Sequence, residues 1–131
     1  MSGSSYEREC KKTLEANGWR VWRSAGSFGE GDLVCLRPSS YSGCPNCMVV
    51  ECKKTSKDRY YISSSGRSKE QFRSLLELSR AGYPVFYAVR LRGERVWYFF
   101  KVSRYKDFCL DVGFPVLYPD KCDFRLEVKD E

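Results

Sequence analysis

Two short apolar segments, DLVCLR at residues 32–37 and CMVVECKK at residues 47–54, constrain the fold more than any other feature of the sequence. Both are rich in β-branched and apolar residues, which is typical of largely buried strands. A loop of turn-forming residues, PSSYSGCPN, separates them, so we expect a hairpin. In an antiparallel hairpin the start of the first strand lies opposite the end of the second, which would bring Asp32 to within about one residue of Cys52.

The remaining patterns alternate between helix and strand. Ser4 or Ser5 can cap a first helix closed by Asn17 and Gly18, and SKEQ at Ser68–Gln71 is a capping box for a second. The expected elements are helices over residues 6–16 and 68–82, and strands over residues 19–25, 32–37, 47–54, 84–91 and 95–102. This order predicts an α/β (mixed α+β) protein with a central mixed β-sheet flanked by helices, in a single domain over residues 1–131. The last 28 residues predict an irregular wrap with one more strand.

The chain contains no histidine, which excludes Ser–His and Cys–His nucleophilic pairs, histidine-ligated zinc and the usual general base near neutral pH. Catalysis would have to use carboxylates, lysine, hydroxyls, thiols or a bound metal. The N-terminus lacks the apolar core of a secretory signal, and no apolar run approaches the ~20 residues that span a membrane. We therefore expect a soluble, cytoplasmic protein with no membrane partner.

Charge is unevenly distributed along the chain. The net charge is +6. The segment from Lys53 to Arg73 contains seven basic residues and only two acidic ones, Asp58 and Glu70. From Tyr105 to Glu131 there are four basic and seven acidic residues. A basic middle with an acidic tail favours one face that meets a polyanion, although a solvated charged surface explains the same numbers.

Asp32, Glu51 and Lys53 form the most suggestive constellation. Strand residues two apart share a face, so Glu51 and Lys53 project together while Cys52 points away. With Asp32 opposite, two carboxylates and a lysine would meet at one end of the sheet. Such a pocket suits Mg²⁺, with Mn²⁺ as a substitute, and Lys53 could orient a water or stabilise a pentavalent phosphate. A surface ion pair on a strand is the alternative that the spacing alone leaves open.

The segment YERECKKTLEANGWRVWRSAGSFGEGDLVCL, followed by VVECKKTSKDRYYI, resembles the archaeal Holliday junction resolvases of the PD-(D/E)xK nuclease superfamily. The resemblance covers roughly residues 6–102. It implies a restriction-endonuclease-like core and a homodimer that binds a four-way DNA junction. It also implies paired, Mg²⁺-dependent hydrolysis of two opposed strands without a small-molecule cofactor.

The resemblance also assigns roles to residues. Glu7, Asp32 and Glu51 match the metal-binding acids, and Lys53 matches the catalytic lysine. Ser27 matches a serine near the scissile phosphate. The positions expected to contact DNA phosphates are Arg8, Arg23, Lys54, Lys57, Arg59 and Arg67.

Several residues have a second interpretation. Glu7 could be a capping-box acid if Ser4 is the N-cap, and Glu9 is expected to face solvent. Tyr60 and Tyr61 could stack on junction bases, but sheet or interface packing is the stronger expectation. The run Trp97–Phe100 exceeds what one face of a strand can bury, which favours a subunit interface.

The motif CPNC at residues 44–47 supports a different class of protein. Cys44 and Cys47 could form half of a zinc site, although a disulfide or free thiols at a turn fit better because no second Cys-x-x-Cys exists. Cys35 and Cys52 are expected to be small buried hydrophobic residues. The alternatives to a junction resolvase are therefore another PD-(D/E)xK nuclease of restriction or repair type, and a non-catalytic DNA-binding module.

Overall fold

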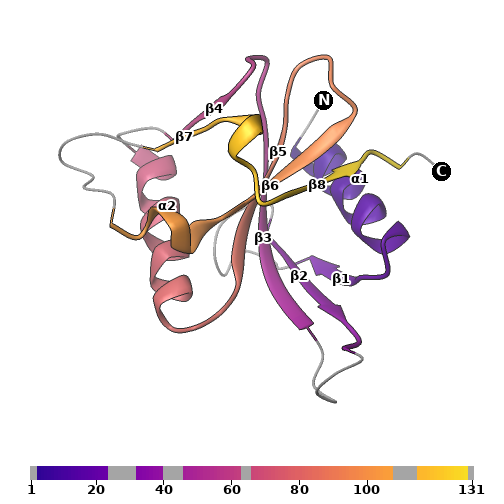
Figure 1. Cartoon of the computed structure of the whole chain (residues 1–131), viewed down its shortest axis with the longest axis horizontal. Helices are drawn as coiled ribbons and strands as arrows, with labels where there is room; N and C mark the ends of the chain where they lie inside the picture. Colours follow the sequence, from indigo (N-terminus) through magenta and orange to yellow (C-terminus); the bar gives the residue numbers. More distant parts are fainter. Residues whose placement is uncertain (1–2, 24–31, 40–45, 63–65, 108–114, 130–131) are drawn as a thin grey trace.

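The computed structural model describes residues 3–23, 32–39, 46–62, 66–107 and 115–129, with the side chains of residues 3, 4 and 32 left out. The elements follow one another in chain order (Figure 1). They are α1 (Gly3–Ala16), β1 (Arg20–Arg23), β2 (Asp32–Arg37), β3 (Asn46–Lys54), β4 (Tyr60–Tyr61), α2 (Gly66–Arg80), β5 (Val85–Arg90), β6 (Val96–Lys101), the 3₁₀ turn η1 (Val102–Tyr105), β7 (Val116–Leu117), η2 (Pro119–Lys121) and β8 (Phe124–Glu127).

The main sheet has six strands in the order β1-β2-β3-β5-β6-β8. Four of its five strand pairs are antiparallel, and β3 and β5 run parallel. A parallel pair needs a crossover connection, which here contains β4 and α2. β4 pairs with β7 in a separate two-stranded sheet. The predicted mixed α+β class with a central mixed sheet is confirmed.

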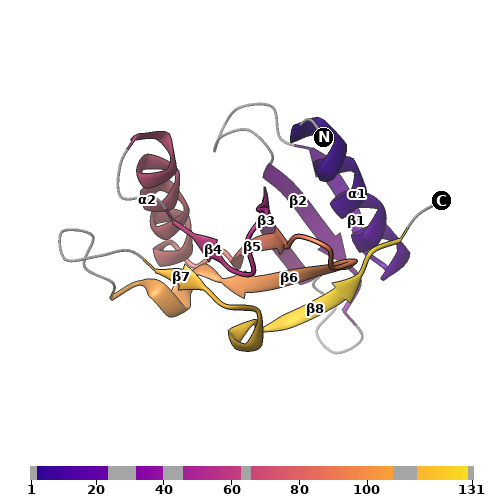
Figure 2. The ribbon, with the colours of Figure 1, turned by 90° about the horizontal axis from the view of Figure 1, so that it is seen from above.

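The two helices pack on opposite faces of the main sheet (Figure 2). Side chains alternate between the faces along each strand, so each face has its own core. The core on the α1 side includes Cys10, Leu14, Val50 and Cys52. The core on the α2 side includes Phe72, Leu75, Leu76 and Tyr87.

The aromatic run on β6 is covered by the chain itself. Trp97 and Phe99 belong to the core on the α1 side, whereas Tyr98 and Phe100 belong to the core on the α2 side. All four are at most 5% exposed. The expectation that this run forms a subunit interface is therefore wrong, because β6 is an inner strand with a packed layer on each side.

Both helices begin earlier than predicted. α1 starts at Gly3, so Ser4 and Ser5 lie inside the helix and Glu7 cannot complete a capping box with Ser4. α2 starts at Gly66, whose φ of 66° lies in the left-handed region open to glycine, and Ser68 is therefore not its N-cap. The end of α1 is as predicted: Gly18 has a φ of 91°, and its N–H donates to the Glu15 carbonyl.

The C-terminal segment completes the edge of the sheet. β8 pairs with β6, and the ring of Phe124 stacks on Phe99 with centroids 4.4 Å apart. The Lys129 N–H donates to the Thr13 hydroxyl on α1, which ties the end of the described chain to the first helix. No helix in the described ranges is long and apolar enough to cross a membrane.

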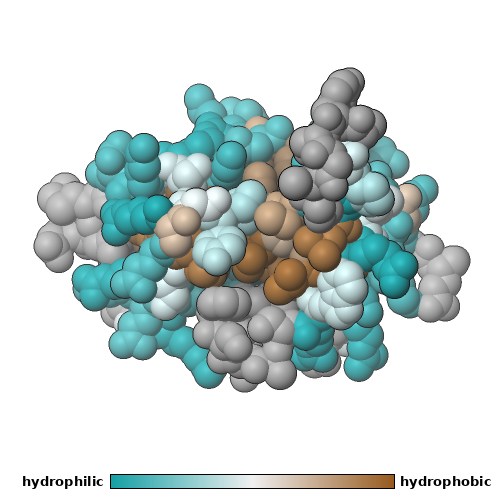
Figure 3. All heavy atoms as spheres, turned by 90° about the horizontal axis from the view of Figure 1, so that it is seen from below, coloured by the Kyte–Doolittle hydropathy of each residue, from teal (hydrophilic) through white to brown (hydrophobic). Residues whose placement is uncertain are grey.

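One face of the molecule carries apolar side chains at its centre, with hydrophilic ones around them (Figure 3). A hollow of about 250 Å³ lies near the start of β3, lined among others by Trp19, Met48, Phe86 and Phe124. Its rim includes Arg37, whose guanidinium lies 4.3 Å from the centre of the Trp19 ring. This hollow is at the opposite end of β3 from Glu51.

Candidate active site

The β2–β3 hairpin sets Asp32 beside Glu51. The strands pair antiparallel, and the Cα atom of Asp32 lies opposite that of Glu51. The predicted register, within about one residue of Cys52, is therefore confirmed. β3 continues for three residues beyond Glu51, to Lys54, where it still pairs with β5. The two acidic residues thus lie at the end of the β2–β3 ladder.

Glu51 and Lys53 project from one side of β3, and Cys52 projects from the other, as the alternation predicted. The Glu51 side chain is 0% exposed, and its Oε1 atom lies 3.5 Å from Nζ of Lys53. Neither Glu51 oxygen accepts a hydrogen bond from any residue that the structure describes. This burial excludes an ordinary surface ion pair. Burying a carboxylate without hydrogen bonds is costly, so such a group in a native fold calls for a functional explanation.

Glu7 reaches the same region from α1. Its side chain is 5% exposed, and its Oε2 atom lies 2.8 Å from Nε of Arg23, although this contact lacks hydrogen-bond geometry. Its negative charge is also felt at Cys52, the residue between Glu51 and Lys53. Glu7 is thus a second buried carboxylate near the end of β3, and the residue that places it there is Cys52, on the opposite side of the strand from Glu51.

Cys10, Cys35 and Cys52 are buried in the core on the α1 side. Burial raises the pKa of the Cys52 thiol well above its usual value, and a hydrogen bond with Cys10 and the charge of Glu7 raise it further. Burial also raises the pKa of Cys35. The thiols of Cys35 and Cys52 are therefore protonated, unreactive core groups at neutral pH, as predicted.

Glu9 does not face solvent, contrary to the sequence-based expectation. Its two carboxylate oxygens accept hydrogen bonds from Nη1 of Arg90 at 2.7 and 2.6 Å, and Oε1 also accepts one from Nε1 of Trp97 at 3.1 Å. The side chains of Arg90 and Glu9 are only 12% and 16% exposed. This buried network ties α1 to β5 and β6, and thereby fixes the helix that carries Glu7.

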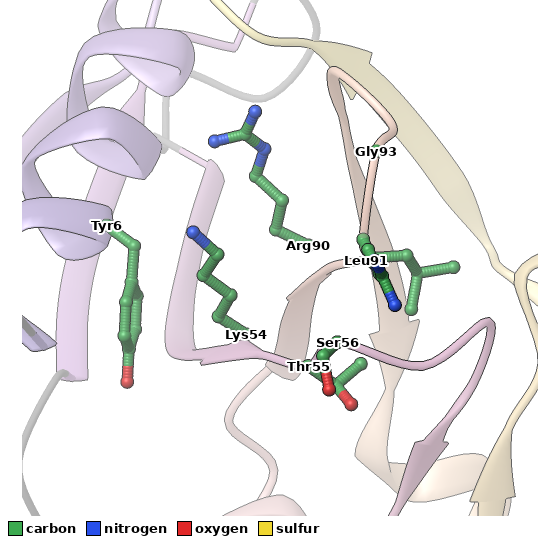
Figure 4. A pocket seen from close by; sticks show the side chains of 8 residues that line it. Tyr6, Lys54, Thr55, Ser56, Arg90, Leu91 and Gly93 are labelled. Atoms are coloured by element: carbon green, nitrogen blue, oxygen red, sulfur yellow. The ribbon is translucent and has the colours of Figure 1, made fainter. Parts of the chain in front are cut away.

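A basic hollow of about 480 Å³ lies next to the end of β3. Figure 4 shows Lys54 and Arg90 extending side by side from neighbouring strands toward α1, with Tyr6 descending from the helix. The hydroxyl-bearing residues Thr55 and Ser56 also line it. Cations and hydroxyls around a hollow of this kind suit phosphate oxygens. The full lining is Tyr6, Lys54, Thr55, Ser56, Arg90, Leu91, Arg92 and Gly93.

The sequence of the chain matches that of a known protein family. Residues 1–109 match the sequence profile of the family described as archaeal Holliday junction resolvase (Hjc). The chain belongs to this family. The resemblance identified from the motifs is thereby confirmed.

Two members of the resolvase family illustrate the relationship. The chain is 36% identical over 96 residues to the crossover junction endodeoxyribonuclease Hjc of Methanocaldococcus jannaschii, and the alignment covers 72% of this chain and 63% of that protein. The structure of Hjc from Archaeoglobus fulgidus, a Holliday junction resolvase, superposes with a TM-score of 0.56 at 22% identity. That match covers 76% of this chain and 72% of the other, and it shows a shared fold.

The residues predicted to contact DNA are dispersed around the site. Arg8 is exposed on α1, and Arg23 is paired with Glu7 while its side chain stays 54% exposed. Lys54 lines the hollow, and Arg67 is exposed on α2, on the other side of the sheet. The structure places Lys57 and Arg59 together in the turn between β3 and β4.

Some predictions fall outside the described residues, and some site residues escaped the sequence analysis. Ser27 and Cys44 lie outside the described ranges, while Cys47 is an exposed free thiol. The sequence analysis missed Arg90 and Arg92, which line the hollow. A signal did exist: Arg92 is the first residue of the tight RGE turn, and Arg90 ends the otherwise apolar strand that precedes it.

Proposed function

We propose that this protein is a metal-dependent endonuclease that resolves four-way DNA junctions by hydrolysing phosphodiester bonds in two opposed strands. The observation that carries the proposal is the buried carboxylate of Glu51, which has no hydrogen-bond partner among the described residues, beside Lys53 and opposite Asp32. Membership in the resolvase family supports the choice of substrate.

The donor set fits a hard divalent cation. Nucleases of this family generally depend on a metal ion. Carboxylate oxygens are the ligands that Mg²⁺ prefers, and a cation would satisfy the Glu51 oxygens that otherwise lack partners. Among the side chains that the structure describes, no group of three acidic, cysteine or histidine residues is arranged so that it could hold a metal ion. The proposed ligand set therefore adds Asp32, from the backbone register, to Glu51 and Glu7.

The metal ion and the protein's own side chains would have separate roles in the reaction. When bound, Mg²⁺, or Mn²⁺ in its place, would lower the pKa of a water molecule and neutralise charge on the phosphate. Lys53, whose side chain is 21% exposed and held 3.5 Å from Glu51, is placed to orient the attacking water or to stabilise the charged transition state. Ser27 is proposed to lie near the scissile phosphate. Arg8 and Arg23 are proposed to hold neighbouring phosphates.

Paired cleavage implies two active sites. A four-way junction presents two equivalent strands, and a twofold symmetric homodimer would present two equivalent sites at a fixed separation. We therefore include a homodimer in the proposal. Selectivity for junctions would then come from dimer geometry and backbone contacts, because phosphate contacts position DNA without reading its sequence.

The test of the function compares substrates and metal conditions. A labelled four-way junction should be cut in opposed strands when Mg²⁺ is present and should stay intact in EDTA, whereas a linear duplex of the same length should be cut far more slowly. Products are resolved on a denaturing gel. Preference for the duplex would identify another type of PD-(D/E)xK nuclease. Binding without cleavage under any metal would favour a non-catalytic DNA-binding module.

The basic hollow makes a separate prediction about affinity. Replacing Lys54 or Arg92 with serine should weaken junction binding, whatever the DNA sequence. The slope of log K against log salt concentration should fall in magnitude by about one for each phosphate that the variant no longer neutralises. Fluorescence anisotropy across a salt series in EDTA measures this slope. Lys101→Ser is the matched control, because Lys101 is exposed and pairs with Phe86 near the start of β5. Equal slopes for all three variants would remove the hollow from the DNA-binding surface.

A further inference from the structure

The turn after β3 and the short β4–β7 sheet present aromatic rings and cations to solvent. β4 lies beside β7 (Figures 1 and 2), and Tyr60 pairs with Leu117 while Tyr61 pairs with Val116. Tyr60 and Leu117 face inward, where the Tyr60 ring packs 6.3 Å from that of Tyr87. Tyr61 lies on the outer face and is 49% exposed. Packing therefore explains Tyr60 but leaves Tyr61 unexplained.

Each exposed ring here has a cation over it. Nζ of Lys57 lies 5.1 Å from the centre of the Tyr61 ring. The guanidinium of Arg59 lies 5.3 Å from the centre of the Tyr118 ring, which is on a residue 40% exposed. We refer to Lys57, Arg59, Tyr61 and Tyr118 as the β4–β7 platform.

The platform is held in place by local contacts. Asp58 accepts hydrogen bonds from Nε and Nη2 of Arg59 at 2.9 and 3.1 Å, which fixes the plane of the guanidinium. The Lys57 N–H donates to Oγ1 of Thr55, and the Thr55 N–H donates to the Arg90 carbonyl. Because Thr55 also lines the basic hollow, the platform continues the basic surface that begins at Lys54.

This combination suits one class of ligand. Nucleobases stack on tyrosine rings and on guanidinium planes in a manner that tolerates any sequence, while neighbouring lysines meet the phosphates. A base inside a duplex has both faces covered by its neighbours, so only an unpaired or unstacked base can use such a platform. Because Asp58 pairs with Arg59, it is the charge of Lys57 that favours a polyanion over an apolar protein surface.

We propose that the β4–β7 platform stacks an unpaired base of the DNA strand that runs away from the active site. The proposal rests on the proposed function for its choice of DNA as the partner. Of the four platform residues, Tyr118 lies beyond residue 109, where the match to the family ends.

The test measures binding in EDTA, so that it does not depend on cleavage. The probes are a thymine-rich single strand carrying one 2-aminopurine and a fully paired duplex of the same length. Tyr61→Ala and Tyr118→Ala should each weaken single-strand binding by about tenfold and reduce the quenching of 2-aminopurine that stacking causes. Duplex affinity should stay within about twofold of the wild type.

Conservative and remote variants serve as controls. Tyr61→Phe and Tyr118→Phe keep the stacking face and should bind like the wild type. Tyr83→Ala removes an exposed tyrosine from the turn between α2 and β5 and should change nothing. Thermal unfolding of each variant confirms that it is folded.

Three outcomes would overturn the proposal. The alanine variants could keep full affinity for the single strand, or they could lose affinity for strand and duplex equally. They could also leave DNA binding unchanged but alter the sedimentation of the free protein, which would make the platform a contact between protein copies. A protein that passes this test and fails to cut a junction would refute only the proposed function.

Discussion

Replacing Glu51 with glutamine is expected to abolish junction cleavage and, in metal-free buffer, to make the protein harder to unfold. These effects have opposite signs because the same feature causes both. The carboxylate is fully buried and accepts no hydrogen bond from the described residues, so without a metal ion its charge depends on the ion pair with Lys53, whose Nζ lies 3.5 Å from Oε1. Glutamine removes that charge while keeping the shape of the side chain.

The expected magnitudes are large enough to measure. Cleavage of a four-way junction in Mg²⁺ should fall by a factor on the order of a thousand, because a metal ligand at the reacting phosphate would be removed. The free energy of unfolding in EDTA should rise by about 1–3 kcal/mol, because a neutral amide costs less to bury without hydrogen bonds than a charged carboxylate does. Urea titrations followed by tryptophan fluorescence measure the second quantity.

Adding metal distinguishes the removal of a metal ligand from a general increase in the stability of the variant. Mg²⁺ should raise the Tm of the wild type and leave that of Glu51→Gln nearly unchanged, since a ligand that binds only the native state stabilises it. Glu77→Gln is the matched control, because Glu77 is an exposed glutamate on α2. A Glu51→Gln variant that still cuts, or that unfolds more easily than the wild type, would contradict the assignment of Glu51 to the metal.

Replacing Glu9 with alanine should destabilise the protein by about 3 kcal/mol or more. The change leaves Arg90, whose side chain is 12% exposed, without its carboxylate partner and removes the acceptor for Nε1 of Trp97. Removing one member of a buried ion pair is costly because the other charge stays buried. Urea unfolding in EDTA measures the decrease in stability.

Two further variants test whether the ion pair causes this decrease. Glu15→Ala, an exposed position on the same helix, should change stability by less than about 0.5 kcal/mol. Replacing Glu9 and Arg90 together with leucine should recover much of the missing stability, because no unpaired charge would remain. Equal decreases for Glu9→Ala and Glu15→Ala would show that the network contributes little.

The sequence predicted the part of the site that local geometry controls. A hairpin with a defined loop fixes which residues face one another, and strand alternation fixes which side chains share a face. These two rules brought Asp32 opposite Glu51 and placed Lys53 beside it, with Cys52 on the other side. The second hairpin, β5–β6, followed from the same logic.

The features that the sequence did not predict depend on contacts between residues that are far apart in the sequence. Glu9 finds Arg90 and Trp97, which are 81 and 88 residues away, so no local pattern could reveal its burial. The β6 aromatics looked excessive because a single sequence does not reveal that a strand is covered on both faces. Arg92 likewise joins Lys54 only through the parallel pairing of β3 and β5.

The C-terminal segment has a structural role, because it forms the last strand of the sheet. This segment lies outside the region that matches the family. β8 begins at Phe124, past residue 109, yet its residues hydrogen-bond to β6 and its first ring covers Phe99. A chain shortened to the matched region would leave the backbone edge of β6 unpaired and uncover aromatic surface beside it. Bare edges of this kind invite strands of other molecules to add on. β8 thus pairs the backbone edge of β6 and covers its aromatic surface, and it becomes the outer strand of the sheet itself.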